Sequence, residues 1–204
     1  MQPDRESVAP EFGPVDVPTD PFSVRIQDAA YEEFLSFGIR RATLDSIARR
    51  AQVGRMTLHR RFANKQQLFA AVLLRENARV VGELDRVAAE QSTLVDALVE
   101  SLAHGIEAIR VHPLFSRLLQ TDRDALAPFL TYETAPLMAD AIRFITDQLE
   151  KRGGSSEVDP QAVEAIFRVC HSIRMAPDAL QDLRDPPTLR DFLRRVIRAF
   201  LDVD

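Results

Sequence analysis

A cluster of arginines within residues 44–62, LDSIARRAQVGRMTLHRRF, is the part of this sequence whose side chains most clearly suggest a chemistry. It is interleaved with apolar residues and contains Arg49, Arg50, Arg55, Arg60 and Arg61. Guanidinium groups pair with phosphate oxygens and with the guanine edge, so a basic surface of this kind favours a polyanion such as DNA. The alternative is a solvated helix face, and the positions of the helices decide between the two.

The charge of the chain is unevenly distributed. The whole chain carries a net charge of −5, but between Gly38 and Lys65 eight basic residues stand against one acidic residue, a net charge of +7 that leaves −12 for the rest. A basic segment on an acidic body indicates a localised anion-binding face, and a body that avoids the same polyanion.

The composition is typical of a folded protein. The chain has 204 residues, of which 46% are hydrophobic, and one cysteine, Cys170. A single cysteine excludes an intramolecular disulfide framework and suits a reducing compartment. No apolar run approaches the roughly 18 residues that a membrane helix needs, and no signal-peptide core is present. We therefore expect a cytoplasmic protein that needs no membrane.

Apolar periodicity predicts an all-α fold. Residues 1–20 are rich in proline and acids, and we expect them to form a disordered acidic tail. Next come a helix with Ile26, Ala30, Phe34 and Phe37 on one face, and two short helices separated by a break at residues 52–54. Residues 21–67 then form a three-helix DNA-binding domain, with Gly38 as the carboxyl cap of its first helix and Thr43 and Asn64 as amino-terminal caps.

The body, residues 68–204, shows only helical patterns. A stripe from Leu94 to Ile109 ends at Pro113, and a long helical stretch at 125–151 is interrupted by Pro128 and Pro136. Residues 152–160 form a loop, and helices at about 160–176 and 187–202 follow.

The order of the short helices is that of a helix-turn-helix, in which the second helix enters the major groove and its neighbours contact phosphates. Leu58 and Phe62 are four residues apart and are expected to face the core, which leaves the polar positions for DNA. The candidate DNA-binding residues are Arg40, Arg41, Thr43, Gly54, Arg55, Thr57, His59, Arg60 and Lys65.

Residues 38–69, GIRRATLDSIARRAQVGRMTLHRRFANKQQLF, resemble the amino-terminal domain of the TetR family of bacterial transcriptional regulators. The family pattern is matched in register by Gly38, Thr43, Ile47, Ala48, Ala51, Val53, Thr57, Leu58, Phe62 and Lys65. Three positions depart from it. Gln52 replaces the glycine of the turn, so a left-handed backbone there would be strained; Gly54 replaces the capping serine of the second short helix; His59 replaces a tyrosine that typically contacts phosphate.

The resemblance implies a homodimer formed by the last two helices of each chain, and hence a palindromic operator. It also implies a pocket in the body for a small, apolar effector. The residues expected to line that pocket are His104, Phe115, Leu119, Phe129, Tyr132, Met138, Phe167 and His171.

The apolar stripe of the last helix is compatible with this dimer contact, and equally with an ordinary core face within one subunit. That stripe consists of Leu189, Phe192, Leu193, Val196, Ile197 and Phe200. Small residues on the preceding helix would allow close helix approach, and both roles remain open.

The sequence predicts no enzyme, no cofactor and no metal site. Cys170 and His171 are consecutive and point about 100° apart on a helix, so they cannot form a nucleophile–base pair. We expect a ligand-responsive transcriptional repressor that binds double-stranded DNA. The alternative is a helical ligand- or protein-binding module with only non-specific DNA affinity.

Overall fold

The computed structural model describes residues 17–131, 135–152, 159–177 and 180–201. Within these ranges the chain is helical and contains no strand, which confirms the expected all-α fold. The helices are α1 (Pro21–Arg41), α2 (Leu44–Arg50), α3 (Arg55–Arg61), α4 (Lys65–Ala89), α5 (Leu94–Val111), α6 (Pro113–Thr121), α7 (Arg123–Thr131), α8 (Ala135–Lys151), α9 (Pro160–Met175) and α10 (Pro186–Leu201).

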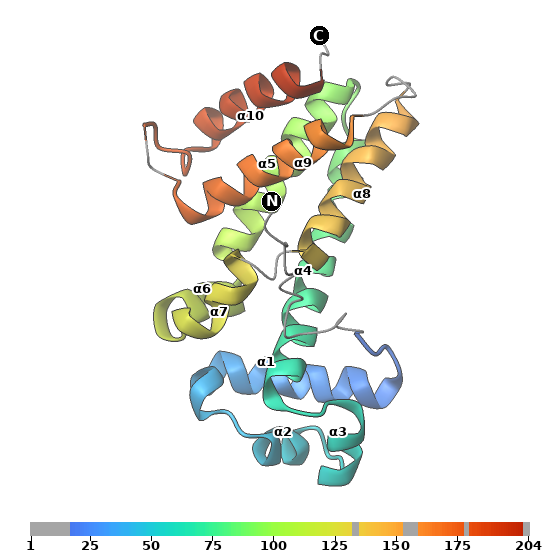
Figure 1. Ribbon diagram of the computed structural model, residues 1–204, viewed down its shortest axis with the longest axis vertical. Coiled ribbons are helices and arrows are strands. Elements are labelled where there is room, and N and C mark those ends of the chain that lie inside the picture. Colours follow the sequence, from blue (N-terminus) through green and yellow to red (C-terminus); the bar gives the residue numbers. More distant parts are fainter. Residues whose placement is uncertain (1–16, 132–134, 153–158, 178–179, 202–204) are drawn as a thin grey trace, which may run out of the picture.

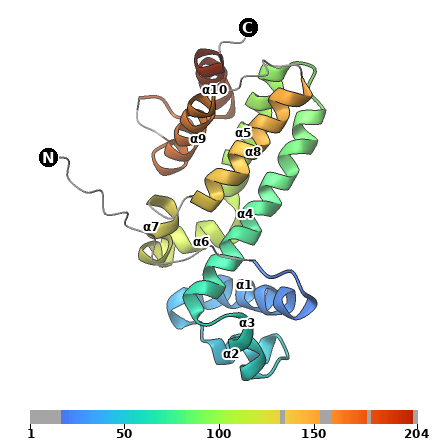
Figure 2. The same ribbon diagram turned by 45° about the vertical axis from the view of Figure 1, so that its right-hand side comes forward.

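The molecule is elongated, and the basic segment forms one end of it. Helices α1–α3 lie together at that end, and α4 leads from them into the body (Figure 1). In the body α4 packs against α5 and α8, while α5 also packs against α9 and α10 (Figure 2). Helices α6 and α7 lie between the two ends, and α6 packs against α1.

Helix α1 is fixed by its cap and by its apolar face. The Asp20 carboxylate accepts a hydrogen bond of 3.1 Å from the Phe22 amide, and Ile26 and Phe34 are fully buried. The expected apolar stripe ends earlier than predicted, because Phe37 is 52% exposed. The expected break at Gly38 is present as a residue with φ of +76°, although one further turn reaches Arg41 before the helix ends. The apolar periodicity of a helix does not show how far along its apolar face the neighbouring helices extend.

Two hydrophobic cores fill the molecule. The first joins α1–α3 to the start of α4 and to α6 and α7, where Leu114, Leu118 and Leu126 are buried against it. The second holds α5, α8, α9 and α10 together with the far part of α4. The expected boundary at residues 67/68 falls inside the continuous helix α4, so the division into 21–67 and 68–204 stays a prediction.

The prolines of the body act differently from one another. Pro136 is the second residue of α8, a position that tolerates proline, whereas Pro128 lies inside α7. The expected helix around 125–151 is therefore two helices. Of the expected tail, residues 1–16 lie outside the described residues. The described residue Pro18 accepts a hydrogen bond of 2.8 Å from the Gln27 side chain through its carbonyl oxygen.

Candidate nucleic-acid interface and ligand cavities

Hydrogen bonds at both ends of α2 fix the helix and the turn that leads from it to α3. At the start of α2 the Thr43 hydroxyl accepts a bond of 3.1 Å from the Ser46 amide, and the Ser46 hydroxyl accepts one of 3.2 Å from the Thr43 amide, a capping box. At the end of α2 the Arg25 guanidinium donates to the carbonyls of Ala51 and Gln52 at 2.6 and 3.1 Å. Gln52 has the expected left-handed backbone, with φ of +54°.

Helix α3 presents one face to the core and another to solvent. Leu58 is fully buried and Phe62 is 1% exposed, as the spacing predicts. Met56 is 81% exposed, and Arg55 beside it is exposed too. Sequence reasoning passed over Met56, although its place two residues before a core leucine marks it as outward-facing. Gly54 caps α3 without a side-chain hydrogen bond, as expected from the loss of the serine.

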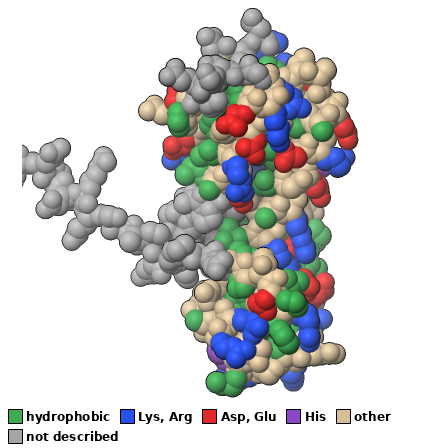
Figure 3. All heavy atoms as spheres, turned by 90° about the vertical axis from the view of Figure 1, so that its right-hand side faces the viewer, with side chains coloured by type: hydrophobic (Ala, Val, Ile, Leu, Met, Phe, Trp, Pro, Cys, Tyr) green, Lys and Arg blue, Asp and Glu red, His purple; other side chains and the backbone are tan. Residues whose placement is uncertain are grey.

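Several basic side chains of this end have partners within the chain. Arg55 lies 3.2 Å from Asp45 of α2, and Arg50 donates to the buried Glu33 of α1 at 2.8 Å. Three arginines of this end, by contrast, have neither an ion pair nor a side-chain hydrogen bond with another described residue: Arg41, Arg49 and Arg60. Figure 3 shows Lys and Arg side chains exposed at the lower end of the molecule, and mixed acidic and basic side chains over the body.

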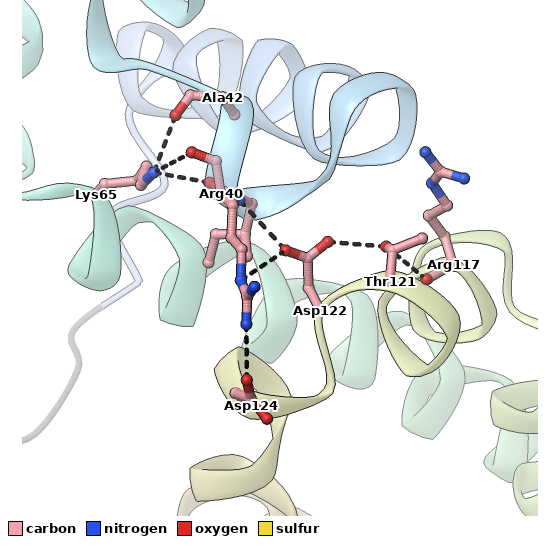
Figure 4. A network of polar contacts seen from close by, with 8 residues as sticks. Arg40, Ala42, Lys65, Arg117, Thr121, Asp122 and Asp124 are labelled. Carbon is pink, nitrogen blue, oxygen red and sulfur yellow. Dashed lines mark hydrogen bonds and ion pairs between the residues drawn. The ribbon is translucent and has the colours of Figure 1, made fainter.

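Two of the residues expected to bind phosphate make contacts inside the molecule (Figure 4). The Lys65 ammonium donates to the carbonyl oxygens of Ile39 at 2.7 Å and Ala42 at 3.0 Å, which caps the end of α1. Arg40 reaches the other way and donates to Asp124 of α7 at 2.6 Å. Both residues hold helices together, and their contacts with DNA stay a prediction.

Asp122 joins the amino-terminal core to α6. This carboxylate is 3% exposed, accepts from the Arg40 amide at 3.3 Å and from the Thr121 hydroxyl at 2.8 Å, and lies 4.0 Å from the Arg40 guanidinium. A Cβ atom at Gly38 would lie 2.5 Å from one Asp122 oxygen. The close approach of α1 to the α6–α7 junction therefore requires glycine at position 38, in space as well as in backbone angle.

Two small cavities in the body are lined by described residues. The central cavity, of about 70 Å³, is bordered by α4, α5, α8 and α9, and the α6-side cavity, of about 90 Å³, by α5, α6, α7 and α9. Both are lined mainly by apolar side chains. Three residues line both cavities: Ile106, Ile109 and Arg174.

The expected pocket residues are distributed unevenly over these cavities. Phe115 and Leu119 line the α6-side cavity, and Phe167 and His171 line the central cavity, where their rings stack with centroids 5.7 Å apart.

The other four lie elsewhere. His104 lines neither cavity: it faces solvent on α5 and lies 3.0 Å from Glu83, because the helix turns it away from the buried stripe. Met138, half-buried near the start of α8, also lies outside both linings. Tyr132 falls outside the described residues, and the Phe129 side chain is likewise not described.

Arg174 is the pocket residue that sequence reasoning missed. It lies four residues after Cys170 and seven after Phe167, so it shares the buried face of α9, where a charged residue is out of place. Burial lowers the pKa of Arg174. The sequence signal that could have identified Arg174 is a charged residue within an otherwise apolar helix stripe.

The one cysteine of the chain, Cys170, lines the central cavity. Burial raises the pKa of the Cys170 thiol to about 12, so the thiol stays protonated at neutral pH. Among the described residues no group of three or more His, Cys, Asp or Glu side chains is placed to hold a metal ion. The described helices also include none long and apolar enough to span a membrane.

Residues 26–72 match the family model of bacterial regulatory proteins of the tetR family. This segment contains the helix-turn-helix and the core that supports it. This segment is therefore similar to the DNA-binding domain of tetR-family regulators. The match supports a DNA-binding transcriptional regulator.

Solved structures of TetR-family regulators share the fold over nearly the whole length. The repressor AlkX from a Dietzia species, implicated in biodegradation of n-alkanes, is 24% identical, with a TM-score of 0.67 over 89% of this chain and 95% of that one. The repressor QsdR from R. erythropolis is 18% identical, with a TM-score of 0.67 over 91% and 97%. FadR from Bacillus subtilis, in complex with stearoyl-CoA, is 15% identical, with a TM-score of 0.52 over 87% and 97%. A search of curated proteins finds no significant match.

Proposed function

We propose that this protein is a repressor of the TetR family that binds a palindromic operator as a homodimer and is released from it by a small effector held in the body. The observation that carries the proposal is the exposed edge of α3, with Arg55 and Met56 outermost and Thr57 and His59 half-buried beside them. Arginine pairs with guanine O6 and N7, and apolar groups contact the thymine methyl, so this edge is suited to base recognition.

The phosphate contacts would come from the cations of this end that have no partner among the described residues. Arg41, Arg49 and Arg60 surround the recognition unit. Phosphate contacts fix the register of a protein on the duplex and supply most of its salt-dependent affinity.

Helices α9 and α10 support the homodimer. The expected stripe of α10 divides in two: Leu189, Leu193 and Ile197 are fully buried inside the chain, while Phe192 is half-buried and Phe200 is 44% exposed. The outward row, formed by Phe192 and Phe200, lies beside a groove between α9 and α10. That groove is lined in part by Val169, Ser172, Ile173, Ala176, Leu180 and Phe192. An exposed apolar face of this kind marks an interaction surface, and a two-fold dimer would place two α3 helices about 34–36 Å apart.

The cavities support control by an effector. FadR of Bacillus subtilis holds stearoyl-CoA in a structure of the same fold. An effector lowers operator affinity only if it binds the released conformation better, and a tenfold preference corresponds to about 1.4 kcal/mol.

A second candidate is a ligand- or protein-binding module with only non-specific DNA affinity. The positive φ of Gln52 and the missing side-chain cap at Gly54 favour it, because both weaken the turn that orients α3.

One experiment separates the two candidates. Random or genomic duplex DNA is selected on the purified protein at about 150 mM salt, where non-specific binding is weak, and the retained DNA is sequenced. Enrichment of a palindrome would support the dimeric repressor. Retention without a shared sequence would favour the non-specific module and contradict the first proposal.

A further inference from the structure

The guanidinium of Arg174 lies where the two cavities of the body meet. Arg174 belongs to the last turn of α9 and lines both cavities, as do Ile106 and Ile109 of α5. The other groups around it are mostly aliphatic and aromatic side chains. The central cavity adds one amide, Asn77, and one imidazole, His171. The α6-side cavity adds Arg110, whose guanidinium donates to the carbonyl oxygens of Leu183 and Arg184.

This guanidinium has no counter-ion among the residues that the structure describes. Across the described residues no carboxylate forms an ion pair with it and no hydrogen bond from it is found, and its Nε atom is buried without an acceptor. The neighbouring Cys170 is a protonated thiol at neutral pH, because burial raises its pKa to about 12. An arginine keeps its charge at neutral pH even when buried, so the body contains an uncompensated positive charge.

Other arginines of the body show how unusual this is. Arg190 of α10, which is half-buried like Arg174, contacts both Glu100 at 2.8 Å and Glu107 at 3.0 Å. Arg168, one helical turn and a half before Arg174 on α9, pairs with Glu164 on the surface. A charge buried without a partner costs several kcal/mol, and such a group in a cavity is a candidate for ligand binding.

The shape and chemistry of the site restrict the ligand. A carboxylate accepts two parallel hydrogen bonds from one guanidinium and neutralises its single charge, whereas a phosphate monoester carries more negative charge than Arg174 alone neutralises. Each cavity, at about 70 and 90 Å³, is smaller than the ~150 Å³ that holds benzene. A ligand that runs from one cavity into the other past Arg174 would use both, which corresponds to about six to ten carbon atoms.

We propose that the effector is an apolar monocarboxylate whose carboxylate group pairs with Arg174, with its hydrocarbon part in the two cavities. This inference rests on the proposed function, in that it identifies the chemical class of the effector. Helix α6 contributes Phe115 and Leu119 to the cavity wall and ends at Asp122, so a ligand in this site touches the helix that contacts α1.

The test compares charged and neutral probes on matched variants. Binding of octanoate and of 1-octanol is measured by calorimetry and by thermal shift with the wild type, Arg174→Gln and the control Arg168→Gln. Octanoate is expected to bind the wild type and Arg168→Gln alike, and Arg174→Gln at least about tenfold more weakly. Octanol is expected to bind all three equally, and more weakly than octanoate binds the wild type.

The apo proteins give a second readout that a purely structural arginine would not produce. Removing an uncompensated buried charge relieves its desolvation cost, so Arg174→Gln is expected to melt at a higher temperature than the wild type without ligand. Equal octanoate affinity in wild type and Arg174→Gln, or no binding of octanoate, hexanoate, decanoate and benzoate to the wild type, would overturn the proposal.

Operator binding is measured separately on the selected DNA. If the protein showed no sequence preference in DNA binding, the proposed function would be contradicted, but the comparison of octanoate affinities would not be affected. Octanoate that binds through Arg174 but leaves operator affinity unchanged would show that the site is not an effector site, and the inference would fail on that point.

Discussion

Two residues of the described chain have positive φ, and only one of them is glycine. Gln52 has φ of +54°, in the left-handed region that costs a residue with a Cβ atom about 1–2 kcal/mol. Gln52→Gly should therefore stabilise the protein by about 0.5 kcal/mol, after the greater entropy of glycine in the unfolded chain is subtracted. Chemical denaturation of the two proteins measures the difference. A loss of stability would mean that the Gln52 side chain makes a compensating contact.

The opposite change at Gly38 should be costly. Its φ of +76° and ψ of 164° belong to a region that only glycine occupies easily, and an added Cβ would lie 2.5 Å from the Asp122 carboxylate. We expect Gly38→Ala to destabilise the protein by about 2 kcal/mol or more, because strain of this kind costs about 1–3 kcal/mol before Asp122 moves. The midpoint of urea unfolding checks the prediction, and an unchanged midpoint would contradict it.

Arg55 and Arg60 should differ in what they contribute to DNA binding. Arg55, at the start of α3, is placed to contact bases, whereas Arg60 has no partner inside the described chain and suits a phosphate. Arg55→Ala is expected to reduce discrimination at one base pair by about 1–3 kcal/mol. Arg60→Ala should weaken binding to all sequences and lower the salt slope by about one. Fluorescence titrations over a range of salt concentrations distinguish these effects, and identical behaviour of the two variants would refute the assignment.

At the scale of the elements, Asp122 connects α6 to the end of α1. Asp122→Ala removes an acceptor from the Arg40 amide and from Thr121, and should cost about 1–3 kcal/mol, as for other buried bonds to a charged group. Asp124→Ala is the matched control, because the ion pair between Asp124 and Arg40 is exposed and such pairs contribute about 0–1 kcal/mol. Thermal unfolding of both variants gives the comparison. Equal losses would show that the buried carboxylate has no special role.

Helix α10 is attached to α5 by an ion pair that titrates. The hydrogen bond from Arg194 to Asp96, 2.6 Å long, holds the pKa of that carboxyl below its usual value of 3.8. A folded-state pKa that is lowered stabilises the fold above pH 3.8, and this stabilisation is lost as the pH falls below it. The melting temperatures of the wild type and Arg194→Met should thus differ most at pH 7 and approach one another as the pH falls below 3.8. A difference that stays constant as the pH falls would point to packing by the arginine stem instead.

The sequence predicted the elements near the amino terminus better than the contacts between elements. Thr43 and Asn64 cap helices as expected, since capping depends on residues within one turn. Arg40 and Lys65 were assigned to phosphate from their local position, yet their partners in the structure are 84 and 23–26 residues away. The Arg40 pair depends on how α7 returns to α1, and the Lys65 contacts depend on how the start of α4 packs against the end of α1. No local pattern encodes either arrangement. Arg174 lies between these two cases. Its position on the buried face of α9 could be predicted from the sequence, but its lack of a partner could be seen only in the fold.

At the scale of the whole molecule, the outward row of α10 should hold two copies together. Phe200 is 44% exposed beside the half-buried Phe192, and in a two-fold dimer this row would lie near its own copy. Phe200→Glu would place a carboxylate in that contact, near its equivalent on the partner. Like charges in an interface cost several kcal/mol, so the dimer dissociation constant should rise about 100-fold or more. Sedimentation analysis over a range of protein concentrations measures it.

The control for this variant is Phe37→Glu, since Phe37 is similarly exposed at 52% but lies on α1 at the opposite end of the molecule. It should leave the dimer intact. Because a palindromic operator is bound by two α3 helices at once, Phe200→Glu should also weaken operator binding while each chain keeps its fold and its affinity for a single half-site. A wild type that is monomeric at all concentrations, or a Phe200→Glu variant that dimerises as well as Phe37→Glu, would place the dimer contact elsewhere than on α10.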